Sequence, residues 1–193
     1  MHFSRLSTLA AAALAASVAF GASGARAERF VNVLTGGTSG VYYPLGVALS
    51  KIYGDKIPDV RTQVQATKAS VENLNLLQQG KGEIGFSLGD SVKLAAEGDA
   101  DAGFKAPLDK LRGIAAIYPN FIQIVATKDS GVTSLADLKG KSLAAQTRGN
   151  TAEIVTQHVL QVFGLSYNDL KVNFMASYND AVSLLKDGHA QAF

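Results

Sequence analysis

The chain has 193 residues, no cysteine, 18 basic and 16 acidic side chains. The lack of cysteine excludes a disulfide-stabilised scaffold, a zinc–thiolate site and a cysteine nucleophile. No cluster of five or more Lys and Arg residues occurs, so the sequence has no basic patch of the kind that binds nucleic acid.

The first 27 residues have the features of a targeting segment. Arg5 precedes an apolar, Ala-rich run over residues 6–22, and Ala25-Arg26-Ala27 fits the small-x-small pattern of a cleavage site. The run is too short and too rich in alanine to be a convincing membrane span. We therefore predict a signal peptide over residues 1–27, cleavage after Ala27 and a periplasmic location. Residues 1–27 hold two of the basic residues and no acid, so the remaining chain has zero net charge.

The first half of the remaining chain alternates between strand and helix patterns. The β-branched and period-two stretches predict strands over residues 29–35, 60–66 and 84–88. Apolar residues at helical spacing predict helices that run from Tyr43 to Tyr53, from Ser70 to Gly80 and from Asp90 to Glu97.

The second half continues this alternation after a polar loop over residues 98–110. We predict two apolar strands, 111–118 and 121–127, and then a short helix over 134–139. The elements that follow are a strand over 141–145, a helix from about Asn150 to Phe163, a strand over 172–174 and a helix over 179–186. This β–α order predicts an α/β fold with a mainly parallel sheet and helices on both faces.

The Gly-rich stretch 36–44 (GGTSGVYYP) is the most informative for function. Glycine adopts positive φ and lets a ligand approach the backbone closely, while Thr38 and Ser39 add hydroxyl groups. The predicted helix start behind this loop is a favourable place for an anion. Because ligands bind at the carboxyl ends of strands in open α/β sheets, we expect the loops at Gly36, Ala66, Leu88 and Gln146 to converge on one site for a small anionic ligand.

The sequence gives little support for catalysis. Residues 135–142 lack the first glycine of a phosphate-binding P-loop, and Val41 stands where a G-x-S-x-G nucleophile elbow needs its last glycine. Beyond residue 27 the only histidines are His158 and His189, and no spacing suggests a metal site. We therefore expect a protein that is not an enzyme and that has no cofactor and no bound metal.

A series of motifs, taken together and in order, resembles one family. The motifs are residues 36–44, 70–74 (SVENL), 83–86 (EIGF) with Asp90, 118–125 (YPNFIQIV), 128–131 (KDSG) and 135–141 (LADLKGK). They are similar to the TAXI family of extracytoplasmic solute receptors, which serve TRAP transporters. The resemblance covers essentially all of residues 28–193, although the last motif is common to many periplasmic binding proteins.

The resemblance implies a type II periplasmic binding fold with two α/β lobes that close on a ligand. Lobe one would comprise residues 28–120, and residues 121–193 would form a crossing strand and a partial lobe two. The implied function is capture of a small carboxylate, such as glutamate, glutamine or 2-oxoglutarate, and its delivery to the membrane subunits of a TRAP permease. We expect a monomer that binds no nucleic acid. The alternatives are a ligand-sensing module for a membrane sensor, an enzyme on the same fold and a remnant that no longer binds.

The resemblance also assigns the residues that would contact the ligand. They come from the Gly-rich loop, from the starts of the next two helices and from a loop of lobe two: Gly37, Thr38, Ser39, Gly40, Tyr42, Tyr43, Ser70, Asn73, Gly89, Asp90, Gly149, Asn150 and Thr151. Each also has a structural explanation. The glycines fit a tight turn, the tyrosines fit helix packing, and the polar side chains fit helix caps or a surface position.

Three features depart from the family pattern. Leu88 and Gly89 replace an expected Gln-Ser pair, which puts the identity of the ligand in doubt. Arg148 stands in a loop that is usually rich in Gly and Pro, where it either pairs with a ligand carboxylate or is solvated. Residues 187–193 correspond to a point at which family members continue, so we expect either a fragment of a longer protein or a truncated product.

Overall fold

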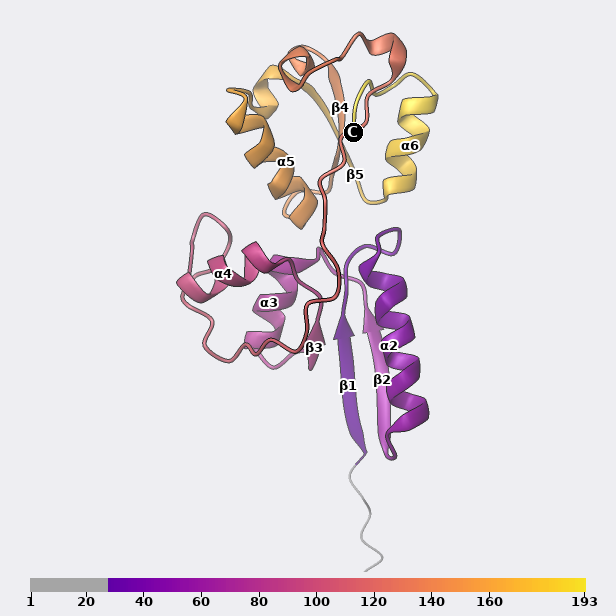
Figure 1. The fold of residues 1–193 in the computed structure, drawn as a ribbon, viewed down its shortest axis with the longest axis vertical. Helices are drawn as coiled ribbons and strands as arrows, with labels where there is room; N and C mark the ends of the chain where they lie inside the picture. Colours follow the sequence, from indigo (N-terminus) through magenta and orange to yellow (C-terminus); the bar gives the residue numbers. More distant parts are fainter. Residues whose placement is uncertain (1–27) are drawn as a thin grey trace, which may run out of the picture.

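The computed structural model describes residues 28–193, which form two lobes connected by one long extended segment (Figure 1). The predicted signal peptide lies outside the described residues. Within residues 28–193, no helix has the length and apolar character that a membrane crossing requires.

Lobe one contains a parallel three-stranded sheet in the order β2-β1-β3. The strands are β1 (Arg29–Leu34), β2 (Val60–Gln65) and β3 (Ile84–Gly85). The central strand β1 pairs with both neighbours, and its Val33 faces Val64 on β2 and Ile84 on β3. Val33 and Leu34 are fully buried, so the core of this lobe is built around the end of β1.

Three helices complete lobe one: α2 (Tyr42–Lys56), α3 (Ser70–Gln78) and α4 (Gly89–Glu97). Figure 1 shows α2 alongside β2, whereas α3 and α4 lie on the side of β3. Leu74, Ala95, Ala102 and Phe104 form a hydrophobic cluster between α3, α4 and the loop that follows. The polar loop predicted over 98–110 is therefore anchored in the core by Phe104, which is fully buried.

A glycine lets α2 pack closely on the sheet. A Cβ atom at Gly46 would overlap the methyl group of Thr35, at the end of β1, and would also touch Val64 and Val33. At Gly54 in the same helix, a Cβ atom would meet only the Thr62 hydroxyl, at 3.8 Å.

Alanine substitutions at these two glycines should therefore have opposite effects on stability. We expect Gly46→Ala to lower the free energy of unfolding by about 1–3 kcal/mol, because overpacking displaces the helix. Gly54→Ala should raise it by up to about 1 kcal/mol, because alanine favours a helix interior. Urea denaturation followed by circular dichroism measures both changes in unfolding free energy. Changes in the same direction for the two variants would contradict the close packing of α2.

Lobe two is built on a parallel pair of strands, β4 (Ser142–Gln146) and β5 (Lys171–Met175). The helices α5 (Thr151–Val162) and α6 (Tyr178–Lys186) lie on opposite sides of this pair (Figure 1). Three short 3₁₀ turns complete the lobe: η1 (Lys128–Ser130), η2 (Leu135–Leu138) and η3 (Tyr167–Asp169).

The alternation of side chains along β4 creates two cores in lobe two. Leu143 packs with Leu138, Leu160, Leu165 and Ala192. Its neighbour Ala144 packs on the other side, in a cluster whose other members are Met175, Ala181 and Ala190. Ala192 also forms a parallel bridge to Leu143 and an antiparallel bridge to Ala126, which extends the sheet beyond β4.

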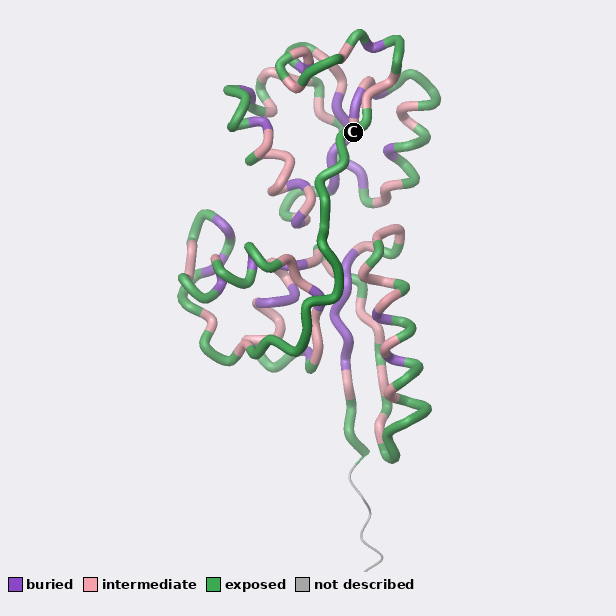
Figure 2. The backbone as a smooth tube through the Cα atoms, in the orientation of Figure 1, coloured by how far each residue is buried: buried purple, intermediate pink, exposed green. Residues whose placement is uncertain are grey.

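The sequence predicted most elements well but was wrong about residues 111–127. Neither predicted strand forms a ladder, and the only pairing in this range is beside Ala126. Residues 112–125, called the linking segment below, are extended and exposed throughout, as Figure 2 shows by the long green stretch between the lobes. Their strand-forming side chains have no neighbouring strand within the described chain. The strand predicted over 84–88 is also shorter, because only Ile84 and Gly85 pair with β1.

Candidate functional site

The loops that follow the strands of lobe one meet the starts of the helices of lobe two. The Tyr178 N–H donates to the Ser39 hydroxyl at 3.0 Å, and the Thr151 N–H donates to the Lys68 carbonyl at 3.1 Å. We call this region, formed by residues 36–42, 67–70, 147–151 and 176–178, the inter-lobe junction. It brings together the loops after β1, β2 and β4, which the sequence predicted, and the loop after β5, which it did not. The predicted loop at Leu88 contacts Ser70 within lobe one.

The Gly-rich loop forms a tight turn in the junction. The Gly40 N–H donates to the Gly37 carbonyl at 2.9 Å. A Cβ atom at Gly40 would lie 3.3 Å from that carbonyl and 3.6 Å from the ring of Tyr178. Gly36, Gly37 and Gly40 do not have positive φ, so the turn does not use the left-handed backbone that glycine allows. Only at Gly40 does a close approach favour glycine. Thr38 is exposed at the tip of the turn.

Tyr42 and Ser70 connect the starts of α2, α3 and α4. The Tyr42 ring stacks on Phe86 with 5.3 Å between the ring centres. Ser70 is fully buried, and its hydroxyl accepts a hydrogen bond from the Leu88 N–H at 3.0 Å. Burial, with a smaller contribution from Tyr118, raises the pKa of Tyr42 to about 12, although a hydrogen bond with Ser70 opposes this shift. Tyr42 is therefore a neutral phenol at neutral pH.

The raised pKa of Tyr42 makes stability depend on alkaline pH. An unfolded tyrosine ionises near pH 10 and folded Tyr42 near pH 12, so its contribution is complete below pH 10 and is lost as pH rises towards 12. We expect Tyr42→Phe to flatten the decline in unfolding free energy over this interval. Urea titrations of both proteins at several pH values test this, and parallel declines would contradict it.

Asn73 is fully buried in lobe one. Its Nδ2 donates to the carbonyls of Thr35 at 2.6 Å and Phe86 at 2.8 Å, and its Oδ1 accepts from the Thr67 hydroxyl at 2.6 Å. The side chain thus joins the ends of β1 and β3 to the loop after β2. The expectation that Asn73 and the buried Ser70 contact a ligand is not supported by this arrangement, since both are closed to solvent and bonded to protein.

Helix starts differ in detail from the predicted caps. Asp90 is the second residue of α4, where its carboxylate accepts from the Ser91 N–H at 2.6 Å, and the N-cap position is Leu88. A Cβ atom at Gly89 would have no neighbour within 4 Å, so the space beside this residue is open. The N-cap of α3 is Ala69, not Ser70, and Ala69 has a φ of 70°. The residue before it, Lys68, accepts a hydrogen bond from the Thr151 N–H through its carbonyl.

The lobe-two loop is held by the start of α5. The Asn150 side chain caps this helix by accepting from the Ala152 N–H at 2.8 Å. The Gly149 N–H donates to the buried Glu153 carboxylate at 3.0 Å, and Gly149 has a φ of 77° that favours glycine. Thr151 does not cap the helix, because its N–H and hydroxyl both point to the Lys68 carbonyl. Tyr43, on the opposite lobe, is half-buried in the first turn of α2.

Arg148 is exposed in its loop, which agrees with the expected role of a solvated charge. Its guanidinium carbon lies 4.2 Å from the centre of the Phe174 ring and 5.9 Å from that of Tyr167. These are cation–π distances within lobe two. The Tyr167 hydroxyl in turn donates to the Glu153 carbonyl at 3.3 Å.

Sequence reasoning missed two residues of the junction. Tyr178 begins α6 directly after β5, so the strand-end and helix-start signal that identified the other loops was present there as well. Lys68 takes part through its backbone carbonyl, and a backbone group has no signature in the sequence. Within residues 28–193, no group of three or more His, Asp and Glu side chains is arranged to hold a metal ion.

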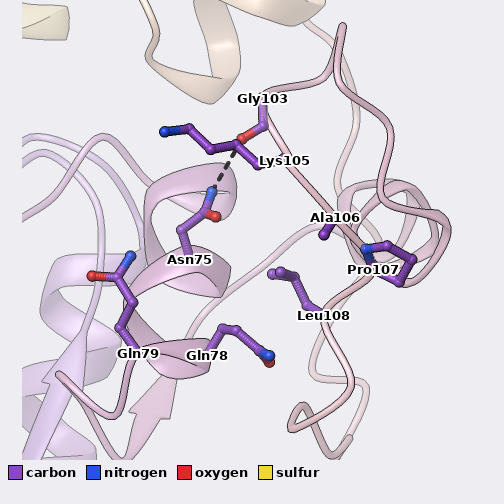
Figure 3. A pocket seen from close by; sticks show the side chains of 8 residues that line it. All are labelled: Asn75, Gln78, Gln79, Gly103, Lys105, Ala106, Pro107 and Leu108. Carbon is purple, nitrogen blue, oxygen red and sulfur yellow. Dashed lines mark hydrogen bonds between the residues drawn. The ribbon is translucent and has the colours of Figure 1, made fainter.

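A cavity of about 460 Å³ lies away from the junction, between α3 and the loop 103–108 (Figure 3). Amide side chains of α3 and Lys105 border it, and the Asn75 amide donates to the Gly103 carbonyl at 3.3 Å. Its side chains are partly or fully exposed, and the hollow is open to solvent.

Solved structures define the class of this fold. SsuA of Xanthomonas axonopodis pv. citri, an alkanesulfonate-binding protein bound to MOPS, aligns over 87% of this chain and 54% of its own, with a TM-score of 0.53 and 20% identity. PhnD1 of Prochlorococcus marinus, in complex with methylphosphonate, aligns over 86% of this chain and 62% of its own, with a TM-score of 0.53 and 13% identity. The chain therefore has an α/β fold of the periplasmic-binding-protein class, as the sequence predicted.

The family follows from the sequence itself. The profile of the NMT1-like family matches residues 33–193, and the chain belongs to that family. It spans about half of the length of SsuA, the first of the two solved structures.

Proposed function

We propose that this protein is an extracytoplasmic solute receptor, which captures a small carboxylate between its lobes and delivers it to a TRAP-type permease. The junction carries this proposal, because Ser39 and Lys68 of lobe one lie against the starts of α6 and α5. Helix starts favour anions, and their N–H groups are accessible when the lobes separate. Closure over a ligand would be a hinge movement about the linking segment.

Two further observations support a small anionic ligand. The sequence motifs resemble the TAXI receptors, whose ligands are small carboxylates. The similar solved structures are an alkanesulfonate-binding protein and a complex with methylphosphonate, and sulfonates and phosphonates are both anions. Residues 1–27 carry the features of a signal peptide, which supports a periplasmic receptor.

Calorimetric titration tests this function directly. Glutamate, glutamine and 2-oxoglutarate are titrated into the full chain, with an alkanesulfonate and methylphosphonate as ligands of the other two classes. We expect saturable binding of a carboxylate, with Thr38→Ala weakening it about tenfold or more, as loss of a hydrogen bond to a charged group does. Thr156→Ala, on the second turn of α5, is the matched control and should bind normally.

The outcome distinguishes the proposed function from its rivals. Binding of only the sulfonate or phosphonate would overturn the carboxylate assignment, and no binding by a folded chain would overturn the receptor function. Chemical turnover of a bound carboxylate would identify an enzyme instead. Equal affinities of Thr38→Ala and the wild type would show that Thr38 of the Gly-rich loop does not contact the ligand.

A further inference from the structure

Glu153, in the first turn of α5, is the only charged residue among residues 28–193 that is buried, with 2% of its surface exposed. A carboxylate loses favourable hydration when it is buried, so it needs hydrogen bonds in compensation. Both of its oxygens are engaged. Oε2 accepts from the Gly149 N–H at 3.0 Å, and Oε1 accepts from the Gln157 amide at 2.8 Å.

The bond to Gly149 differs from the usual cap of a helix. In a capping box, an acidic side chain at the third position of the helix accepts from the backbone N–H of the N-cap residue. Here the N-cap residue Asn150 donates its N–H to the Thr147 carbonyl instead, and Glu153 reaches one residue further back. Gly149 has a φ of 77°, which glycine adopts readily. The carboxylate therefore holds a bend in the loop before α5.

This bend is a surface through which lobe two meets Lys68 of lobe one. The Lys68 ammonium lies 3.8 Å from the position of a Cβ atom built on Gly149. Two residues further on, the Thr151 N–H and hydroxyl donate to the Lys68 carbonyl at 3.1 and 3.4 Å. Figure 1 shows that α5 begins on the side of lobe two that faces lobe one. The position of Gly149 thus decides where the side chain and the carbonyl of Lys68 contact lobe two.

The groups around Glu153 hold the same bend from its outer side. Burial and then the neighbouring Glu153 carboxylate raise the pKa of Tyr167, while Arg148 opposes this shift. Tyr167 is therefore a neutral phenol, and its hydroxyl donates to the Glu153 carbonyl at 3.3 Å. The rings of Phe174 and Tyr167 carry Arg148, the residue before Gly149. Arg148 is thus fixed on the exposed side of the bend, and Glu153 holds the bend from the interior.

We propose that Glu153 is a positioning residue, whose carboxylate fixes the bend at Gly149 and so holds the start of α5 in the arrangement that closes on Lys68. This role rests on the proposed function only in that closure of the junction retains the ligand. Glu153 itself makes no contact with the ligand. A loop that is already ordered when the lobes meet lowers the entropy that closure costs.

Hydrogen exchange of single amides in the ligand-free full chain tests this role. Glu153→Met fills the same space without an acceptor, and the exposed Gly149 N–H can donate to water, so we expect an almost unchanged free energy of unfolding. The Thr151 and Tyr178 amides, which donate across the junction, should nevertheless exchange about tenfold faster or more. Tyr178 is the decisive reporter, because it begins α6, on the other side of the strand pair from α5.

Two further variants separate the hydrogen bond from a general disturbance of α5. Glu153→Gln keeps a carbonyl oxygen for the Gly149 N–H, and Gln157 can turn its amide to accept from the new N–H group. Both junction amides should then exchange as in the wild type. Thr156→Val removes a bond to the Ala152 carbonyl one turn further along α5 and should also leave them unchanged. If Glu153→Met does not fold by circular dichroism, Glu153→Ala replaces it.

Three results would overturn the positioning role. The first is unchanged exchange of the Tyr178 amide in Glu153→Met, and the second is equally fast exchange in Glu153→Gln. The third is faster exchange of the Leu165 amide as well, which donates to the Leu160 carbonyl in the core of lobe two at 2.9 Å, because this would show a general loss of stability.

Calorimetry keeps this role separate from the proposed function. Glutamate, glutamine and 2-oxoglutarate are titrated into the wild type and Glu153→Met. The affinity for a carboxylate that binds should fall in the variant, because a ligand binds more weakly when the closed arrangement is less populated. An equal affinity would overturn the positioning role. If the wild type binds no carboxylate, the proposed function fails, while faster exchange of the junction amides in Glu153→Met still supports the positioning role.

Discussion

Replacing Asn73 with alanine is expected to lower the free energy of unfolding by about 2–4 kcal/mol, because a buried carbonyl then loses its partner and a small cavity remains. The Phe86 carbonyl accepts from Asn73 at 2.8 Å in the fully buried interior. The Thr35 carbonyl is affected less, since the Thr67 hydroxyl also donates to it at 2.9 Å. Urea denaturation of the purified variant measures the loss.

Asn75→Ala is the matched control, because Asn75 lies on the same helix and also bonds through its amide. Its Nδ2 donates to Val71 of its own helix at 2.9 Å and to Gly103 at 3.3 Å, and both bonds lie closer to water. We expect a loss of less than about 1 kcal/mol, since water replaces the lost partner. Equal losses of unfolding free energy for the two variants would show that the hydrogen bonds of Asn73 to Thr35 and Phe86 do not stabilise lobe one as expected.

Removing the hydrogen bonds that Ser39 and Thr151 make across the junction is expected to shift the lobes strongly towards an open arrangement. Thr151→Pro removes both the N–H and the hydroxyl that donate to the Lys68 carbonyl, without breaking α5, because Thr151 is the first residue of the helix and Asn150 before it is extended. Ser39→Ala removes the acceptor of the Tyr178 N–H. The two bonds donated by backbone N–H groups contribute about 1 kcal/mol each, so their loss alone should favour opening about 30-fold.

The distance between the lobes reports this change. Small-angle X-ray scattering should give a larger radius of gyration for the double variant than for the wild type. Thr151→Ser with Ser39→Thr keeps the N–H donor and the hydroxyl groups on both sides, and it should scatter as the wild type does. An unchanged radius in the double variant would show that other contacts hold the junction closed.

The fold was largely predictable because each element carries its own local pattern. The Gly-rich loop, the strand ends and the start of α5 at Asn150 were all identified by spacing and residue type alone. The linking segment was not, because a strand pattern does not say whether a neighbouring strand exists. The site was predicted less well, since the same polar residue at a helix start can face a ligand or the core. Ser70 and Asn73 face the core, and only their long-range partners Leu88 and Phe86, in the loop after β3, reveal it.

The pairing of Ala192 sets the order in which the two lobes can fold during synthesis. The sheet and hydrophobic cluster of lobe one lie within residues 29–108, so this lobe can be assembled while the rest of the chain is still being made. Lobe two needs Ala192 between Leu143 and Ala126, and Ala192 is fully buried in its core. The ribosome must therefore have passed the codon of Ala192 before lobe two closes, and until then Leu143 and its apolar neighbours remain available to chaperones.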